Sequence, residues 1–252
     1  METVKIKING IEVETPKGST ILEAAHSAGI KIPTLCYLKG INAIGACRMC
    51  LVEVKGARAL AAACVYPVNE GMEVFTNTPT LRKSRQTTLE LLLSNHRSDC
   101  LSCVRNTDCE LQNLCREYNV DMHRFASDRT EPEIEQSTPH LVRDNSKCIL
   151  CRRCVAVCKK NQHVGVINVS KRGYQTHVGS AFDMPLGETA CVNCGQCISV
   201  CPVGALYEVD DTAKVWNAIA DPDKHVIIAP APSVRAQLGE CFGLPIGTSV
   251  TG

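Results

Sequence analysis

The cysteine pattern constrains this chain more than any other feature of its sequence. Two runs share the spacing C-x2-C-x2-C-x3-C, the first over residues 148–158 and the second over 191–201. Dense thiolate runs of this kind typically bind [4Fe–4S] clusters, and the fourth cysteine of each run serves the cluster of the other. Zinc rarely takes so dense a set of ligands. The repeat therefore predicts two clusters, one held by Cys148, Cys151, Cys154 and Cys201, the other by Cys191, Cys194, Cys197 and Cys158.

A different set of cysteines precedes the repeat and consists of Cys36, Cys47, Cys50 and Cys64. A [2Fe–2S] cluster needs two thiolates for each iron, so four converging cysteines can hold one. Gly45 and Ala46 are small enough to let backbone amides approach the sulfides. A four-cysteine zinc site remains an alternative from spacing alone, because zinc also accepts C-x2-C with distant partners.

A third set combines one histidine with three cysteines: His96, Cys100, Cys103 and Cys109. Three thiolates and one imidazole can occupy the four iron corners of a [4Fe–4S] cluster. A lone histidine more often has a surface or capping role, and zinc on one histidine and three cysteines competes on spacing. We predict that His96 is the fourth ligand, because it lies four residues before a C-x2-C.

Two of the 17 cysteines fall outside these sets, Cys115 and Cys241. Cys115 lies on the apolar face of a predicted helix, where a cysteine is usually a small core residue. We expect neither thiol to be a ligand. Disulfides are disfavoured because the N-terminal residues lack the apolar stretch of an export signal, and in a reducing compartment C-x-x-C groups usually bind metal.

Charge and hydropathy exclude several classes of partner. The chain has 27 basic and 26 acidic residues, a balance that does not favour nucleic acid or an anionic membrane. It has no run of eighteen apolar residues, so no transmembrane helix is expected. These features predict a soluble, cytoplasmic protein.

Local patterns predict secondary structure around the cysteine sets. Near the N-terminus we expect a hairpin turning at Asn9-Gly10, a helix with a capping box of Thr20 and Glu23, and strands at 50–55 and 71–76. Later elements are a helix over 81–93 capped by Thr80, a helix over 109–118, a linker over 121–140, and a hairpin from 164–169 and 174–178 around Gly173.

The last thirty residues predict the start of a further domain. Residues 226–230 form an apolar run typical of a buried strand, and Ser233 could cap a helix over 234–242. One strand and one helix cannot bury their own faces. We therefore expect the chain to be the front part of a longer protein.

At these residues the chain resembles the N-terminal iron–sulfur region of an [FeFe]-hydrogenase large subunit. The order of the modules is also similar to that in the large iron–sulfur subunit of respiratory complex I, in diaphorase subunits of NAD-linked hydrogenases and in NAD-linked formate dehydrogenases. Residues 229–240, APAPSVRAQLGE, resemble the first strand and helix of the hydrogenase catalytic domain. The cysteine motifs of the catalytic cluster in that family have no match here.

The resemblance implies an α+β multidomain fold. Its expected parts are a β-grasp [2Fe–2S] ferredoxin domain over 1–78, a helical histidine-ligated [4Fe–4S] domain over 79–138, a bacterial 2[4Fe–4S] ferredoxin domain over 139–210 and an incomplete hydrogenase catalytic domain over 223–252. Its cofactors would be one [2Fe–2S] and three [4Fe–4S] clusters, the catalytic hydrogen cluster lying outside this sequence.

The implied function is electron transfer between a redox partner and a hydrogen-converting domain, in an NAD(P)-linked or electron-bifurcating assembly. The expected hetero-oligomer contains an NAD(P)H-oxidising flavoprotein and a thioredoxin-like [2Fe–2S] subunit, with ferredoxin as a further partner. No nucleotide-binding glycine motif occurs here, so NAD(P) would bind a partner. The alternatives are a freestanding electron-transfer subunit of a diaphorase or formate dehydrogenase and a zinc-bound structural module.

Overall fold

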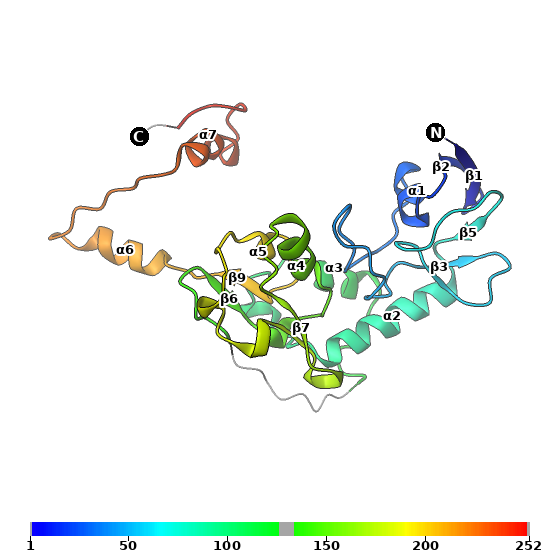
Figure 1. Ribbon diagram of the computed structural model, residues 1–252, viewed down its shortest axis with the longest axis horizontal. Helices are drawn as coiled ribbons and strands as arrows, with labels where there is room; N and C mark the ends of the chain where they lie inside the picture. Colours follow the sequence, from blue (N-terminus) through cyan, green and yellow to red (C-terminus); the bar gives the residue numbers. More distant parts are fainter. Residues whose placement is uncertain (1, 126–133, 251–252) are drawn as a thin grey trace. The chain divides into compact units, whose positions relative to one another are not determined.

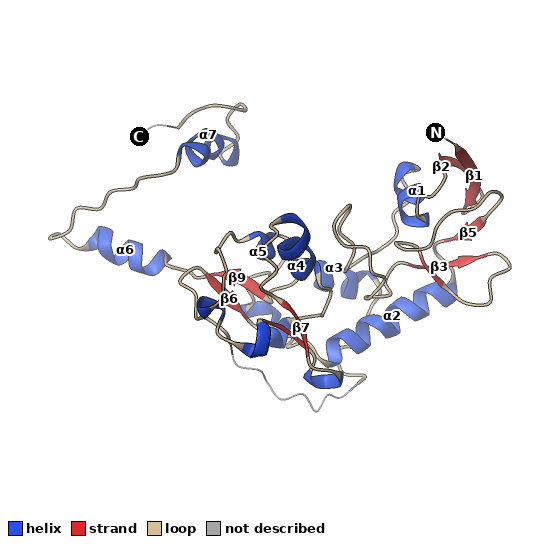
Figure 2. Ribbon diagram, in the orientation of Figure 1, coloured by secondary structure: helices blue, strands red, loops and turns tan. Residues whose placement is uncertain are grey.

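Two compact units make up the chain, Met1–Val209 and Asp210–Gly252. The computed structural model describes residues 2–125 and 134–250, whose helices and strands are drawn in Figures 1 and 2. Part of the predicted linker at 121–140 lies outside these described residues. None of the described helices is long and apolar enough to cross a membrane.

The first unit begins with a five-stranded sheet of order β2-β1-β5-β3-β4, made of β1 (Thr3–Ile8), β2 (Ile11–Pro16), β3 (Leu51–Val54), β4 (Ala61–Ala62) and β5 (Glu73–Phe75). β1 pairs antiparallel with β2 and parallel with β5, while β3 pairs antiparallel with β4 and β5. Asn9 and Gly10 join β1 to β2 with φ of 52° and 84°, the left-handed backbone that a tight hairpin turn needs. The predicted hairpin and both later strands are confirmed.

One face of this sheet and the helix α1 (Ile21–Ser27) form an apolar core. Along β1 the side chains alternate between exposed and buried, which places Ile6 and Ile8 inside. The predicted capping box is confirmed. The Thr20 hydroxyl accepts the Glu23 N–H at 3.2 Å, and the Thr20 N–H donates to the Glu23 carboxylate at 2.8 Å.

The next two helices are α2 (Pro79–Ser94) and α3 (Glu110–Glu117), with the 3₁₀ turn η1 (Cys100–Ser102) between them. The helices lie where the sequence predicted them, but Thr80 does not cap α2. Thr78 is the N-cap, and its hydroxyl accepts the Leu81 N–H at 3.2 Å. Pro79 then occupies the first helical position, where a missing N–H costs no hydrogen bond.

The region of the cysteine repeat has little regular structure. Two short antiparallel pairs join β6 (Leu141–Arg143) to β9 (Leu206–Glu208) and β7 (Asn168–Ser170) to β8 (His177–Gly179). The helical segments are α4 (Arg153–Ala156), α5 (Gln196–Ser199), η2 (Asn145–Lys147), η3 (Val157–Asn161), η4 (Gly173–Gln175), η5 (Ala181–Asp183) and η6 (Leu186–Glu188). The predicted hairpin exists but starts later than expected, because the N–H groups of Val164 and Gly165 donate to the Cys158 carbonyl instead.

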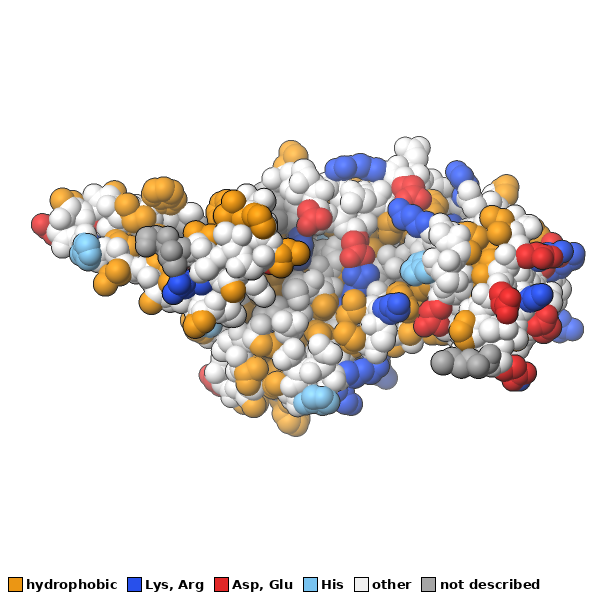
Figure 3. Space-filling view, turned by 90° about the horizontal axis from the view of Figure 1, so that it is seen from above, with side chains coloured by type: hydrophobic (Ala, Val, Ile, Leu, Met, Phe, Trp, Pro, Cys, Tyr) orange, Lys and Arg blue, Asp and Glu red, His pale blue; other side chains and the backbone are white. Residues whose placement is uncertain are grey.

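The second unit contains α6 (Thr212–Ala220), which the sequence had not predicted, and α7 (Pro232–Cys241). The predicted buried strand at 226–230 is wrong: no strand is formed there, and Ile227 and Ile228 are 83% and 81% exposed. Ser233 is not the cap of α7, since Ala231 is the N-cap and Pro232 begins the helix. Hydrophobic side chains accordingly lie on the surface of this unit (left end of Figure 3).

Candidate metal-cluster sites

The first cysteine set converges in a buried place beside the N-terminal sheet. Cys36, Cys47, Cys50 and Cys64 are all at most 6% exposed. The Sγ atoms of Cys50 and Cys64 are 3.4 Å apart, and the Cys36 thiol is within hydrogen-bonding reach of Cys47 and Cys64. The loops before β3 and after β4 therefore bring together four thiols, the first and last of which are 28 residues apart in sequence.

The thiols of this set strongly influence one another's pKa. Hydrogen bonds from the thiols of Cys47 and Cys64 lower the pKa of Cys36 to about 2. The bond to Cys36 is the largest influence raising the pKa of both Cys47 and Cys64, and burial adds to it. The Cys64 thiol in turn lowers the pKa of Cys50 to about 7, so without metal the four thiols do not ionise together. A cationic iron–sulfur core would stabilise all four thiolates, so this donor set fits an iron–sulfur cluster.

The loop around Gly45 gives the Cys36 sulfur backbone donors. Gly45 has a φ of 62°, and a Cβ built there would already contact Val65 and Ala62 at 3.5 and 3.6 Å. Backbone hydrogen bonds from Cys47 and Ala46 also lower the pKa of Cys36. N–H donors of this kind are common around iron–sulfur clusters, where they influence the reduction potential.

Asn42 links this set to the cysteine repeat. Its side chain is buried, and its amide Nδ2 donates to the carbonyl oxygens of Cys36 at 2.8 Å and Cys151 at 3.2 Å. Cys36 and Cys151 also belong to one apolar cluster of buried side chains. Two predicted ligands of different clusters, 115 residues apart in sequence, are thus held by a single amide group.

The histidine-containing set lies between α2 and α3. His96 follows the end of α2, Cys100 begins η1, and Cys109 is the N-cap of α3. Burial is the main reason that the pKa of Cys109 is raised, and the neighbouring Cys103 and Cys100 thiols raise it further. Cys100 and Cys103 are therefore close enough to Cys109 to influence its pKa. His96 is partly buried and precedes these cysteines in sequence.

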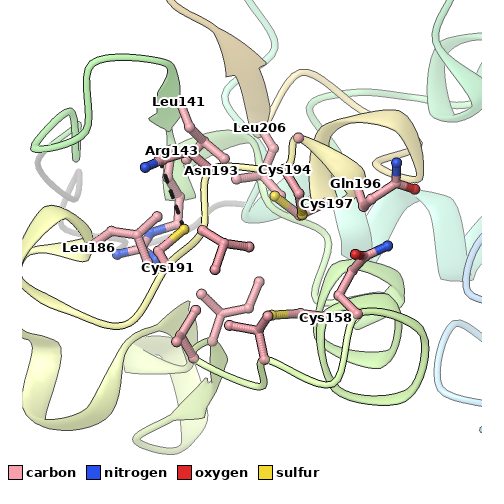
Figure 4. A pocket seen from close by; sticks show the side chains of 16 residues that line it. Leu141, Arg143, Cys158, Leu186, Cys191, Asn193, Cys194, Gln196, Cys197 and Leu206 are labelled. Atoms are coloured by element: carbon pink, nitrogen blue, oxygen red, sulfur yellow. Dashed lines mark hydrogen bonds between the residues drawn. The ribbon is translucent and has the colours of Figure 1, made fainter. Parts of the chain in front are cut away.

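The repeat forms two separate pockets, each lined by four cysteines. One pocket contains Cys148, Cys151, Cys154 and Cys201, together with Ile149, Val178, Val203 and Leu206. The other contains Cys158, Cys191, Cys194 and Cys197 among apolar side chains such as Leu141, Ile167 and Leu186. In Figure 4, Cys158 lies across the second pocket from the other three cysteines. The fourth cysteine of each run thus faces the first three cysteines of the other run.

The two runs also share a backbone conformation. Leu150 and Arg152 in the first run have left-handed φ of 54° and 61°, and the equivalent Asn193 and Gly195 have 52° and 71°. A short helix lies within each run, α4 in the first and α5 in the second, and contains its third cysteine. Left-handed residues turn the chain sharply, which lets one short loop present three thiols to the same pocket. The sequence repeat is therefore a structural repeat.

Three polar side chains near these sites were not recognised from the sequence: Asn42, Arg85 and Arg153. Arg153 forms a two-point ion pair with Glu110 at 2.6 and 2.9 Å, joining α4 to α3. Burial lowers the pKa of Arg153, but Glu110 outweighs it and Cys151 and Cys36 add to the rise. Only Arg85 had a usable signal, since it lies at i+4 from Leu81 and i−4 from Leu89 on the apolar face of α2.

The two cysteines left out of the sets differ in environment. Cys115 packs against the buried cluster between α2 and α3, and burial is the main reason that its pKa rises to about 12. Cys241 is exposed on α7.

Within residues 2–125 and 134–250, no three His, Cys, Asp or Glu side chains converge closely enough to hold a single metal ion. The sixteen ligands of the four sets remain predictions.

Three family models match successive parts of the chain. A 2Fe-2S iron-sulfur cluster binding domain matches residues 1–79, an NADH-ubiquinone oxidoreductase-G iron-sulfur binding region matches 85–124, and a 4Fe-4S dicluster domain matches 147–205. The predicted mixture of [2Fe–2S] and [4Fe–4S] domains in an α+β chain is confirmed at this level.

Curated relatives include hydrogenases and a ubiquinone oxidoreductase subunit. The chain is 45% identical over its whole length to the NADP-reducing hydrogenase subunit HndD of Solidesulfovibrio fructosivorans, covering 44% of that protein. It is 36% identical over 98% of its length to iron hydrogenase 1 of Clostridium pasteurianum, covering 43%. It is 36% identical over 85% of its length to the NADH-ubiquinone oxidoreductase 75 kDa subunit of Reclinomonas americana, covering 31%. The chain thus spans less than half the length of these relatives.

One solved structure has a similar fold, the crystal structure of an NAD+-reducing [NiFe]-hydrogenase in the H2-reduced state. The TM-score is 0.76 and the sequence identity 30%. The match covers 81% of this chain and 87% of that chain.

Proposed function

Because this chain belongs to the family of iron–sulfur electron-transfer subunits of NAD(P)-linked hydrogenases, which its resemblance to [FeFe]-hydrogenase had predicted, we propose that it relays electrons through four clusters. The family is one of oxidoreductases. When bound, iron–sulfur clusters accept and pass on one electron at a time. The observation that carries the proposal is the pair of pockets in the repeat, each lined by four cysteines drawn from both runs.

The proposed ligands follow the predicted sets. Cys36, Cys47, Cys50 and Cys64 would hold a [2Fe–2S] cluster in a β-grasp domain, an assignment supported by the parallel pairing of β1 with β5. His96, Cys100, Cys103 and Cys109 would hold one [4Fe–4S] cluster, and the two pockets of the repeat would hold the others. The boundaries 1–78, 79–138 and 139–210 and the assignment of 223–252 to a catalytic domain belong to the same proposal.

The contact made by Asn42 supports a direct route between the [2Fe–2S] site and the repeat. Its amide joins the carbonyl groups of Cys36 and Cys151, so two ligand-bearing loops are held together through one side chain. Burial keeps water out of this junction and fixes its geometry. We place the electron-accepting end at the [2Fe–2S] and His96 sites and the hydrogenase-facing end at the repeat.

The whole protein's activity is proposed to be reversible H2 oxidation and proton reduction. In support, the two hydrogenase relatives match 100% and 98% of the chain, whereas the ubiquinone oxidoreductase subunit matches 85%. The proposed hetero-oligomer is cytoplasmic and includes an NAD(P)H-oxidising flavoprotein, a thioredoxin-like [2Fe–2S] subunit and, as electron acceptor or donor, ferredoxin. The test is H2-dependent dye reduction by the intact purified protein. Reduction is expected, and its absence in a cluster-loaded preparation would contradict the hydrogenase assignment.

The second candidate is a carrier subunit without hydrogen chemistry, as in a diaphorase or formate dehydrogenase. The identity of 36% to a ubiquinone oxidoreductase subunit favours it, because a region similar to this chain occurs there in an oxidoreductase of another kind. The two candidate functions differ in which reductants can reduce the protein. A carrier would be reduced by NAD(P)H through its flavoprotein partner but not by H2, whereas the hydrogenase would be reduced by both.

A further inference from the structure

Arg85 is a charged residue at a core position of α2. It is 2% exposed and is among the largest fully buried side chains of the described residues. Leu81 and Leu89, one turn away on either side, are both fully buried. Arginine is almost never buried to this extent unless its charge is balanced or used, because removing a cation from water is costly.

The guanidinium of Arg85 is held by uncharged oxygens. Its Nε donates to the Met49 carbonyl at 3.1 Å, and its Nη2 donates to the carbonyls of Leu51 at 2.8 Å and Thr76 at 2.9 Å. Its Nη1 donates to the Tyr118 hydroxyl at 3.2 Å. None of these four acceptors is a carboxylate, so they stabilise the cation without cancelling its charge.

Two of the acceptors flank a predicted cluster ligand. Met49 and Leu51 are the residues immediately before and after Cys50, which is fully buried. The fork of Arg85 therefore fixes the backbone of the Cys50 loop on both sides of the thiolate. It also places a positive charge beside the [2Fe–2S] site on a side chain that is only 2% exposed, and a buried charge is screened less than an exposed one.

We propose that Arg85 is a positioning residue that raises the reduction potential of the [2Fe–2S] cluster by holding a positive charge, hydrogen-bonded only to uncharged acceptors, next to the Cys50 loop. The proposal rests on the assignment of that cluster to Cys36, Cys47, Cys50 and Cys64. Reduction adds one electron to the cluster, and a nearby cation stabilises the more negative reduced form. Net charge and hydrogen bonds are two of the factors that set cluster potentials.

A solely structural role for Arg85 makes a different prediction. The four hydrogen bonds could serve only to join α2 to the sheet and to α3. Loss of the guanidinium fork would then matter equally whether or not a positive charge replaced it. A comparison of a neutral and a charged replacement separates the two roles.

The test is a redox titration of the [2Fe–2S] EPR signal in the intact protein. For Arg85→Gln we expect the ratio of reduced to oxidised cluster at the wild-type midpoint to fall about tenfold, a decrease of about 59 mV for one electron. Arg85→Lys keeps the charge and should stay within about threefold of wild type. The control Lys83→Gln removes an exposed charge of the same helix and should leave the midpoint unchanged, because water screens it.

A second pair of variants leaves Arg85 in place, in case its replacement prevents cluster assembly. Tyr118 lines a polar cavity together with Arg85, Thr76, Asn9 and the acidic Glu117, so a further carboxylate has room there. Tyr118→Glu would set a negative charge against the guanidinium and should lower the [2Fe–2S] midpoint. Tyr118→Phe removes only the hydroxyl and should not.

The outcomes separate the inference from the cluster assignment. A midpoint that falls in Arg85→Gln and Tyr118→Glu but not in Arg85→Lys and Tyr118→Phe supports the proposal. Equal falls in Arg85→Gln and Arg85→Lys, or no fall in Tyr118→Glu, overturn it while the cluster assignment stands. A wild-type protein without any [2Fe–2S] signal overturns both.

Discussion

The N-terminal sheet and the cysteine repeat bury their thiols in different ways. In the sheet region, Cys50 and Cys64 join a broad apolar core that includes Ile6, Leu22 and Val52. In the repeat, the buried apolar residues are few, and cysteines make up much of the packing around them. The strands β6 to β9 have only three residues each. The sheet region thus has a core of its own, whereas the proposed clusters would supply much of the interior of the repeat.

Removing iron should therefore separate the two regions. After anaerobic chelation we expect amide protection in β6 and β9 to fall at least about 100-fold, because metal binding here would contribute folding free energy. Protection in β1 and β5 should stay within about threefold, since these strands pack on an apolar core made of residues of the sheet region and α2. Hydrogen exchange with mass spectrometry measures both. Equal losses of amide protection in the two regions would contradict the proposed difference between their cores.

The crosswise arrangement of the repeat can be tested by pairing cysteine substitutions. Cys158→Ser together with Cys194→Ser should cost about four irons per chain, because both thiols line one pocket. Cys158→Ser with Cys151→Ser should cost about eight, because those thiols line different pockets although they share a run. Iron and sulfide analysis gives the result. The opposite pattern would mean that each run serves its own cluster.

Asn42 connects the two regions, so its loss should affect both. Asn42→Leu leaves two buried carbonyl groups without their donor and should lower the free energy of unfolding by about 1–3 kcal/mol. It should also slow electron transfer from the [2Fe–2S] site to the repeat in flash-reduction experiments. Asn69→Leu, at an exposed position, is the matched control. An unchanged transfer rate in Asn42→Leu would show that electron transfer between the two sites does not depend on this contact.

The smallest expected effect concerns the cap of α2, which carries Arg85 beside the sheet region. Thr78→Ala removes the hydroxyl that accepts the Leu81 N–H and should lower the free energy of unfolding by about 1 kcal/mol. Thr80→Ala, at an exposed position of the first turn, should change it by less than about 0.5 kcal/mol. Urea denaturation of both variants measures the two changes in the free energy of unfolding. Equal losses would show that the cap contributes little.

Local signals were sufficient where neighbours in sequence determine the structure. The turn at Asn9-Gly10 and the capping box of Thr20 and Glu23 depend on a few adjacent residues, and both are confirmed. The cap of α2 was misplaced because Thr78 and Thr80 differ only in their position relative to Pro79. The strand at 226–230 was wrong because an apolar run needs a partner strand, and no strand of the described residues pairs with it.

The candidate sites show the same division. The C-x2-C spacings identified which cysteines belong together within a run, and the structure brings the four members of each predicted repeat set to one pocket. Long-range polar contacts had no such pattern. Asn42 is one asparagine among several, and its two carbonyl partners are known only once the chain is folded.

The central claim is that fifteen cysteines and His96 hold one [2Fe–2S] and three [4Fe–4S] clusters. Its most direct test is iron, sulfide and zinc analysis of the anaerobically purified chain, combined with EPR after reduction by dithionite. The prediction is about 14 irons and about 14 sulfides per chain, with one [2Fe–2S] signal and [4Fe–4S] signals. Stoichiometric zinc with no sulfide and no EPR signal would contradict it.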